Sequence, residues 1–273
     1  MCRIFQIHKS SFFRWRKRTP TARSERKAYI ISEIIRIYHW SQCRYGSPRI
    51  AKELNSIGIK VSRKFVGQIM KENHLRSIAK SKYKKTTNPS PNHRAAENRL
   101  QQIFKAGRRN EIWVSDITYV ETGEGWTYLT VVIDLFDRKV IGWSISDTMR
   151  AKDTSIASLT KALLNRPLQN DQELLFHSDR GIQYTCREFI NLLEANKITQ
   201  SMSRKGNCYD NAVAESFFKT LKVELVFQNK YKTKGKAEKS IAEYIENFYN
   251  SCRRHSALNN LTIEEFHNQI VNK

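Results

Sequence analysis

The 273-residue sequence lacks the features of a membrane protein, of a secreted protein and of a zinc-finger protein. Its apolar runs, such as residues 131–133, are much shorter than the roughly 20 residues that a helix needs to cross a bilayer. The N-terminus has no apolar core followed by a small-residue cleavage site, so we expect a cytoplasmic protein. The five cysteines are scattered, and the seven histidines do not combine with them at zinc spacing. Neither a disulfide framework nor a zinc finger is predicted.

Positive charge is concentrated in the first part of the chain. Residues 1–110 contain 27 Lys or Arg against 5 Asp or Glu, whereas residues 111–273 contain 21 of each kind. The whole net charge of +22 therefore lies in the first part. A basic block followed by a neutral one favours an anionic polymer as the partner, with nucleic acid first. Membrane-surface binding is the weaker alternative, because the block lacks a clean apolar helical face with the basic residues on the opposite side.

The basic part of the chain has the pattern of a small helical module. Isoleucines in residues 29–40 recur at near-helical spacing, Pro48 suits the first turn of a second helix, and Ser62 can cap a third. The last two helices form a helix-turn-helix outline, in which Arg63 and Lys64 are candidates for DNA contacts. An ordinary helical bundle with solvated lysines explains the pattern equally well, and the flanking charge favours DNA.

From residue 111 the pattern changes to that of a mixed α/β domain. Residues 112–120 are β-branched and aromatic, with apolar residues on both alternating faces, which predicts a strand covered on both sides. Further strands are expected at 126–135, 140–145 and 174–178, and helices at 155–164 and 187–195. Three antiparallel strands followed by helix, strand and helix indicate a mixed sheet.

Two aspartates lie where such a sheet places its ligands. Asp116 lies inside the first strand, where an ionised carboxylate without a partner would cost several kcal/mol. Asp179 follows an apolar run, at the carboxyl end of a strand. Each alone is more typical of a cap or a turn, but the two together favour a site for a cation.

A polar segment after Ser203 leads into a helix with two stripes. Asp210 or Asn211 is expected to cap this helix. One stripe is apolar and the other, at i, i+4 and i+7, presents a carboxylate and two cations on a common edge. The members of the second stripe are Glu215, Lys219 and Lys222. A solvated Glu–Lys pair is the simplest interpretation of that edge, but its position relative to the two aspartates favours a shared site.

Three blocks of the sequence resemble the catalytic blocks of DDE transposases of the bacterial insertion sequence 3 family, relatives of retroviral integrases. They are WVSDITY (113–119), HSDRGIQY (177–184) and the segment 206–215. The 35 residues between Asp179 and Glu215 are the spacing typical of that family. The resemblance extends to YGSPRI (45–50) and to residues 248–258, and so covers nearly the whole chain. Ile263 departs from it, because the family commonly has proline there.

The resemblance implies both a fold and a chemistry. The implied fold is an RNase H-like integrase catalytic core, a mixed five-stranded sheet flanked by helices, preceded by an all-helical helix-turn-helix-like region. The implied catalytic residues are Asp116, Asp179 and Glu215, which would hold two Mg²⁺ (or Mn²⁺) ions suited to in-line phosphoryl transfer. Lys219 and Lys222 match positions implied in contacting the DNA end.

Other residues of the same blocks are candidates for supporting roles. Arg204 and Lys205 lie in the polar segment and are candidates for DNA contacts. Five residues are candidates for positioning the site or the substrate, with plain packing or capping as an equal alternative: His177, Gln183, Tyr184, Asn207 and Asn211.

The sequence predicts four regions. They are a basic helical DNA-binding region at 1–85 (helix-turn-helix-like at about 29–76), a linker at 86–108, an integrase-like catalytic core at 109–228 and a C-terminal helical extension at 229–273. Residues 76–95 lack periodicity and are basic, so this segment is expected to follow a DNA backbone by charge alone.

The expected activity is metal-dependent DNA cleavage and strand transfer at insertion-sequence ends, which gives DNA transposition, recombination and integration. The expected partners are transposon ends, target DNA, further copies of the chain on that DNA and, from the resemblance, a product of an upstream reading frame. One alternative is an RNase H-like nuclease without strand transfer. Another is a non-catalytic, transposase-derived DNA-binding regulator, against which the intact set of carboxylates argues.

Overall fold

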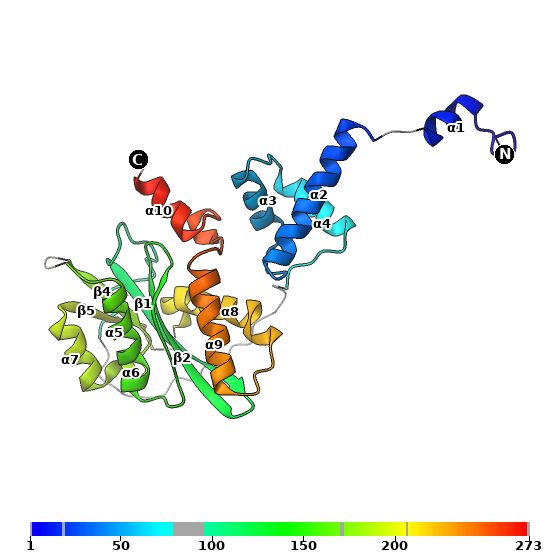
Figure 1. The fold of residues 1–273 in the computed structure, drawn as a ribbon. Coiled ribbons are helices and arrows are strands. Elements are labelled where there is room, and N and C mark those ends of the chain that lie inside the picture. Colours follow the sequence, from blue (N-terminus) through cyan, green and yellow to red (C-terminus); the bar gives the residue numbers. More distant parts are fainter. Residues whose placement is uncertain (1, 18–19, 79–95, 170–171, 206, 272–273) are drawn as a thin grey trace. The chain divides into compact units, whose positions relative to one another are not determined.

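The computed structural model describes residues 2–17, 20–78, 96–169, 172–205 and 207–271. The chain divides into two compact units, Met1–Ile78 and Ala79–Lys273, and each is described by itself (Figure 1). Within the described ranges, no helix is long and apolar enough to cross a membrane. Residues 79–95 lie outside the described residues, and they include most of the basic segment 76–95 and the first part of the predicted linker 86–108.

The first unit is helical, as the sequence predicted. Its helices are α1 (Lys9–Arg16), α2 (Ala22–Trp40), α3 (Ser47–Ser56) and α4 (Arg63–Glu72). α2 begins well before Tyr29, because Thr21 caps it by accepting the Ser24 N–H at 3.3 Å. The core of the unit consists of buried aliphatic side chains: Ile34, Ile50, Leu54, Val66 and Ile69.

Local signals explain where α3 and α4 begin and end. Pro48 lies in the first turn of α3, and Gly58, after its end, has a φ of +86°, which favours glycine. Ser62 accepts a first-turn N–H of α4 at 3.2 Å. The two short helices and the tight turn between them are therefore confirmed. Arg63 and Lys64 are exposed at the start of α4.

The second unit contains a mixed five-stranded sheet in the order β3-β2-β1-β4-β5. The strands are β1 (Ile112–Thr122), β2 (Gly125–Asp134), β3 (Val140–Ser146), β4 (Leu174–Ser178) and β5 (Ile198–Met202). β1, β2 and β3 are antiparallel, whereas β4 runs parallel to β1, and β5 to β4. The pairing of β1 with β4 ends at Val114 and His177, while β1 stays paired with β2 as far as Thr122. The mixed sheet is thus confirmed.

Helices cover both faces of this sheet (Figure 1). One layer contains α5 (Ser155–Asn165), α6 (Ile182–Thr185) and α7 (Arg187–Ala195), and the other contains α8 (Ala212–Glu224) and α9 (Lys234–Glu243). Neighbouring side chains of β1 point to opposite faces of the sheet, so Trp113 packs against the first layer and Val114 against the second. The outer half of β1 differs from the prediction: Tyr119 and Glu121 are exposed, so two covered faces are found only near its beginning.

Shorter elements complete the second unit. They are the 3-10 turns η1 (Ala151–Asp153), η2 (Cys208–Asn211), η3 (Val226–Gln228) and η5 (Ser256–Leu258), the π-helix η4 (Tyr244–Tyr249) and the helix α10 (Ile263–Val271). After η4, the Asn250 side chain bonds to the backbone N–H and C=O of Val140 at 3.0 and 2.9 Å. Arg253 donates to both carboxylate oxygens of Glu224 at 2.6 and 2.9 Å. The C-terminal segment is therefore tied to β3 and to the end of α8.

Candidate active site

Three chain segments bring Asp116, Asp179 and Glu215 near one another. Asp116 lies in β1, and Asp179 follows the parallel strand β4. Because Val114 is in register with His177, each aspartate stands two positions beyond this pair. Glu215 lies in the first turn of α8. The charges of Asp179 and Glu215 both act on Asp116, so the three acids share one electrostatic neighbourhood.

The surroundings of the aspartates disfavour their charged forms. Burial raises the pKa of Asp116 well above its usual range, and the charges of Asp179 and Glu215 act in the same direction. A backbone N–H at 2.8 Å and the charge of Lys222 oppose this shift. Burial also raises the pKa of Asp179, against a hydrogen bond from the Gly181 N–H at 2.9 Å. Such a group of carboxyls favours binding of a proton or a cation.

Ser115, fully buried beside Asp116, joins the three segments. The Tyr184 hydroxyl, in α6 shortly after Asp179, lies 2.8 Å from the Ser115 hydroxyl. The Asn211 amide, directly before α8, donates to the Ser115 carbonyl at 2.9 Å. Two of the five positioning candidates therefore contact the residue next to Asp116. Ser115 itself was not among the predicted residues.

The other three positioning candidates make contacts that suit packing and loop structure. His177 is buried, with its ring nitrogens 2.8 and 3.2 Å from two serine hydroxyls, and burial lowers its pKa to about 4. Gln183 donates to a backbone carbonyl at 3.1 Å. Asn207 accepts a backbone N–H at 3.1 Å. Their roles at the site stay predictions.

The expected cap of α8 is not formed. Asn211 precedes the helix, but no side-chain hydrogen bond caps it, and the Asn211 amide donates to β1 instead. The buried Asp210 carboxylate accepts hydrogen bonds from two side-chain amides, each at 2.8 Å. It also accepts hydrogen bonds from the backbone N–H of Arg204 at 2.8 Å and from its guanidinium at 3.0 Å. Hydrogen bonds from Arg204 hold the pKa of Asp210 far below its usual range, although burial opposes them. Arg204 is therefore already paired, whereas Lys205 is exposed.

Lys219 and Lys222 of α8 lie in different surroundings. Lys219 is exposed. Lys222 is half-buried, and its Nζ lies 5.0 Å from the centre of the Tyr119 ring. Burial lowers the pKa of Lys222, and the charge of Asp116 opposes this shift. Lys222 therefore interacts both with Asp116 and with the exposed Tyr119 of β1.

The chemistry of the three acids suits a divalent cation. Carboxylate oxygens are the hard donors that Mg²⁺ and Mn²⁺ prefer, and a cation would offset the repulsion and burial at Asp116. However, in the part of the chain that the structure describes, no group of three or more His, Cys, Asp or Glu is arranged to hold a metal ion.

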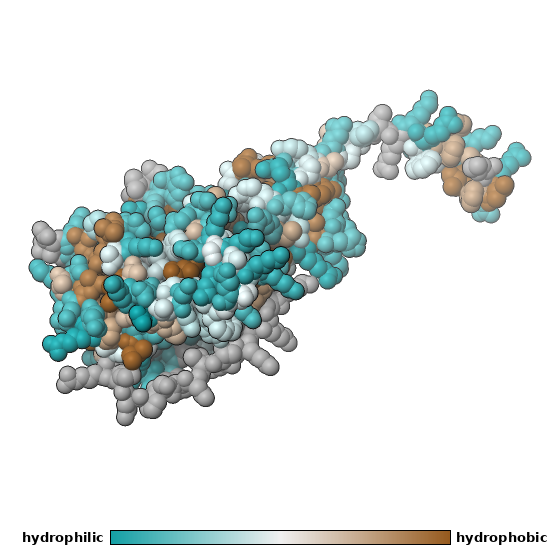
Figure 2. All heavy atoms as spheres, turned by 60° about the horizontal axis from the view of Figure 1, so that its bottom comes forward, coloured by the Kyte–Doolittle hydropathy of each residue, from teal (hydrophilic) through white to brown (hydrophobic). Residues whose placement is uncertain are grey.

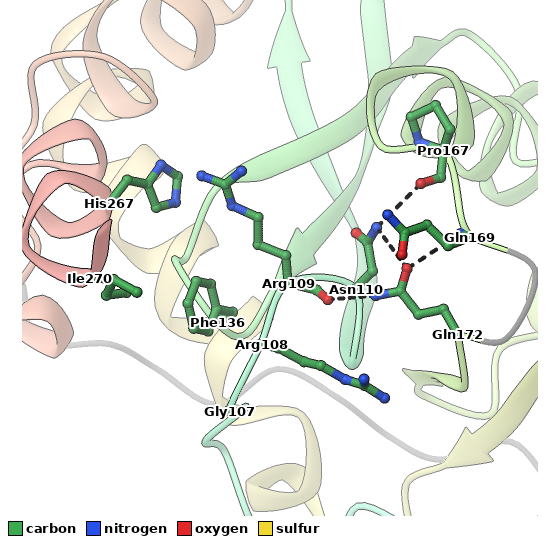
Figure 3. A pocket seen from close by; sticks show the side chains of 10 residues that line it. All are labelled: Gly107, Arg108, Arg109, Asn110, Phe136, Pro167, Gln169, Gln172, His267 and Ile270. Carbon is green, nitrogen blue, oxygen red and sulfur yellow. Dashed lines mark hydrogen bonds between the residues drawn. The ribbon is translucent and has the colours of Figure 1, made fainter. Parts of the chain in front are cut away.

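A hollow of about 750 Å³ lies near the start of β1 and is lined by none of the three acids. Figure 3 shows Arg109 extending toward His267 of α10 across this hollow, with Asn110 beside Gln172. His267, which lines the hollow, also contacts the buried Asp137 at 2.8 Å, and Arg166 forms an ion pair with the same carboxylate. This cluster anchors α10 to the sheet.

Three family models match the chain. One described as an HTH-like domain matches residues 25–83, within and just beyond the helical unit. Two described as an integrase core domain match residues 106–208 and 196–262, which contain the sheet and α8. All three acids lie within the integrase matches.

Curated relatives match over nearly the full length. The Insertion element IS600 uncharacterized 31 kDa protein of Shigella sonnei is 36% identical over 266 residues, 97% of both chains. Transposase InsF for insertion sequence IS3A of Escherichia coli (strain K12) is 36% identical over 271 residues, 98% of this chain and 93% of the relative. Among solved structures, the HTLV-2 integrase catalytic core domain in complex with magnesium (trimeric form) is 19% identical, with a TM-score of 0.44, and covers 58% of this chain and 96% of that one.

Proposed function

The chain belongs to the IS3 family of insertion-sequence transposases, and from this premise we propose that it cleaves DNA at the ends of an element and joins the cut strand to new DNA. One observation carries the proposal: Asp116, in a buried strand, experiences the charges of Asp179 and Glu215 from two other segments. An electrostatic coupling among acids that are far apart in the chain supports this proposal, because carboxylates can hold the metal ions that promote phosphoryl transfer.

Asp116, Asp179 and Glu215 would hold two Mg²⁺ (or Mn²⁺) ions. When bound, the ions would relieve the charge on the attacking and leaving oxygens of an in-line displacement. The carboxylates' own task is to present oxygen ligands from three segments at once. Tyr184 and Asn211 assist by holding α6 and the start of α8 against Ser115.

Basic residues in both units would bind the DNA. Arg63 and Lys64 are exposed at the start of α4, in the part of the chain that carries the whole charge excess. Phosphate contacts of this kind position DNA without reading its sequence. Four further cations belong to the second unit, where they would contact the DNA end: Lys219, Lys222, Arg204 and Lys205.

The proposed enzyme acts as an assembly on DNA in the bacterial cytoplasm. Its partners would be transposon ends, target DNA and further copies of the chain. A product of an upstream reading frame would supply specific recognition of the ends. The four regions predicted from the sequence remain our proposal for how the chain divides these tasks.

The test replaces each acid by its amide, as Asp116→Asn, Asp179→Asn and Glu215→Gln. These changes remove one charge with little change in volume, so we expect cleavage and strand transfer to be lost while DNA binding persists. Glu188→Gln is the matched control, because it alters an exposed acid of α7. Calorimetric titration with Mn²⁺ in two buffers of different ionisation heat provides a second measurement. Since burial raises the pKa of Asp116, we expect the wild-type protein to release protons on binding the ion, and Asp116→Asn to release fewer.

Three results would reject the proposal. Substantial activity in all three amide variants would remove the assigned acids from the reaction. Hydrolysed products without new strand junctions would mean a nuclease. Metal-independent DNA binding without any cleavage, on DNA with the element's own ends, would mean a regulator.

A further inference from the structure

The hairpin of β1 and β2 exposes two aromatic side chains near the acids. Tyr119 is 49% exposed and Trp126 is 48% exposed. Their rings meet edge to face, with centroids 5.0 Å apart. Aromatic side chains of this size usually bury most of their surface. About half of each residue's surface is therefore accessible to a ligand. Figure 2 shows exposed hydrophobic residues scattered among hydrophilic ones on the visible face.

A cation connects this aromatic pair to the acids. The Nζ of Lys222 lies 5.0 Å from the centre of the Tyr119 ring, and the charge of Asp116 acts on the same ammonium group. Tyr119 follows Asp116 by three residues along β1, about 10 Å of strand, and the two side chains leave opposite faces, so Lys222 is the group that links them. The aromatic pair is therefore within reach of the nucleotides that flank a phosphodiester held at Asp116.

Exposed rings beside a cation are the surroundings in which proteins bind unpaired nucleotides. Bases stack on the rings and the cation binds a phosphate. A base inside a duplex has both faces covered by its neighbours, so only an unpaired base offers a free face. We propose that Tyr119 and Trp126 form a stacking site for an unpaired base of the strand whose phosphodiester lies at Asp116, with Lys222 on its phosphate. This proposal rests on the proposed function. It adds that the site prefers DNA with an unpaired base to fully paired DNA.

The charges around the pair indicate where the strand runs. Glu121 lies two residues after Tyr119, on the same face of β1, and is exposed. Its carboxylate repels phosphates, whereas Lys222 attracts them. The sugar-phosphate backbone is therefore expected on the α8 side, with the base reaching outward to the rings. An apolar protein surface fits less well, because covering the pair would also desolvate Lys222 and Glu121.

The experiment measures binding of the full chain to three DNA ends without divalent metal. The ends are fully paired, or have a few unpaired bases on one strand or on the other, and a fluorescent base analogue marks the unpaired position. We expect Trp126→Ala and Tyr119→Ala to weaken binding of one unpaired end by roughly 5- to 150-fold, the effect of losing one stacked base. Binding of the paired end should not change. The fluorescence quenching of the analogue should be lost in the same variants.

Conservative variants and a distant ring provide the controls. Trp126→Phe keeps a ring and should keep the preference, while Trp126→Leu keeps apolar bulk and should lose it, even if Trp126→Ala fails to fold. Phe227→Ala removes a ring that is 63% exposed in η3 and should leave the preference intact. Equal weakening for paired and unpaired ends, or no weakening, would overturn the inference. A change of oligomeric state without DNA in Trp126→Leu would also overturn it, by assigning the rings to a protein contact. Because binding is measured without metal, the outcome is separate from that of the strand-transfer test.

Discussion

Replacing Arg253 by Met is expected to destabilise the second unit strongly. The guanidinium donates to both oxygens of Glu224 at 2.6 and 2.9 Å, and the Tyr244 hydroxyl donates to the same carboxylate at 2.7 Å. Arg253 is only 6% exposed and Glu224 only 4%. Without Arg253, the Glu224 carboxylate would remain buried without its counter-ion.

The magnitude follows from that buried charge. Removing one partner of a buried ion pair costs about 3–5 kcal/mol. In a domain of this size, each kcal/mol lowers the melting temperature by about 2–4 °C, so Arg253→Met should lower it by about 6–20 °C. The double variant Glu224→Leu/Arg253→Met removes both charges. It should therefore recover much of the loss, with a remaining deficit of about 1 kcal/mol because Tyr244 loses its acceptor.

The assay is thermal and denaturant unfolding of the wild-type protein, both single variants and the double variant. A positive coupling free energy is expected, with the double variant more stable than Arg253→Met. Strictly additive losses would refute the reasoning, because they would mean that the two side chains do not interact. Strand transfer, measured well below the melting temperature, should survive in the double variant, since Glu215 lies at the other end of α8.

Two other contacts give sharp expectations. Burial alone would raise the pKa of Asp137, but hydrogen bonds from His267 and Arg166 lower it to about 2, from 3.8 in the unfolded chain. Ionised Asp137 therefore adds stability above the unfolded pKa that is lost as the pH falls toward 2. Asp137→Asn should lower the free energy of unfolding by about 2 kcal/mol at pH 7. The denaturation midpoint of the variant should depend less on pH between pH 4 and 2 than that of the wild-type protein, and an equal pH dependence in both proteins would contradict this. Tyr184→Phe removes only the hydroxyl on Ser115. It should lower the rate of strand transfer at saturating DNA while leaving DNA affinity intact, and an unchanged rate would exclude the positioning role.

The elements that the sequence predicted are those with local patterns. β-Branched and aromatic runs predicted β1 to β3, a short apolar run predicted β4, and apolar stripes predicted α5, α7 and the buried side of α8. β5 and α6 were not read from the residue pattern. β5 is short and has a serine at a buried position, where Ser201 lies 2.8 Å from the His177 ring instead of adding an apolar side chain. Because its composition is polar, the sequence pattern did not predict this buried strand.

The candidate site was predictable only where motifs marked it. The three acids belong to motifs that resemble a known family, but Ser115 carries no such mark. Its bonds to Tyr184 and Asn211 join residues 69 and 96 positions apart, a distance over which periodicity gives no information. Asp210 was expected to be a cap for a similar reason, because nothing local indicates that its carboxylate is buried.

The early end of the pairing between β1 and β4 bears on how the activity of an insertion sequence could be limited. Beyond Val114, β1 remains paired with β2, and β4 remains paired with β5 up to Ser178, so the parting of the two strands leaves the backbone of the sheet well supported. Asp116 and Asp179 follow the point where the two strands separate, and the pairing of the sheet does not depend on their side chains. Under the proposed function, a variant that lost one of these aspartates is expected to fold, to bind DNA and to compete with intact copies. On that proposal, a single substitution at either aspartate is expected to turn the protein into an inhibitor of the element's transposition.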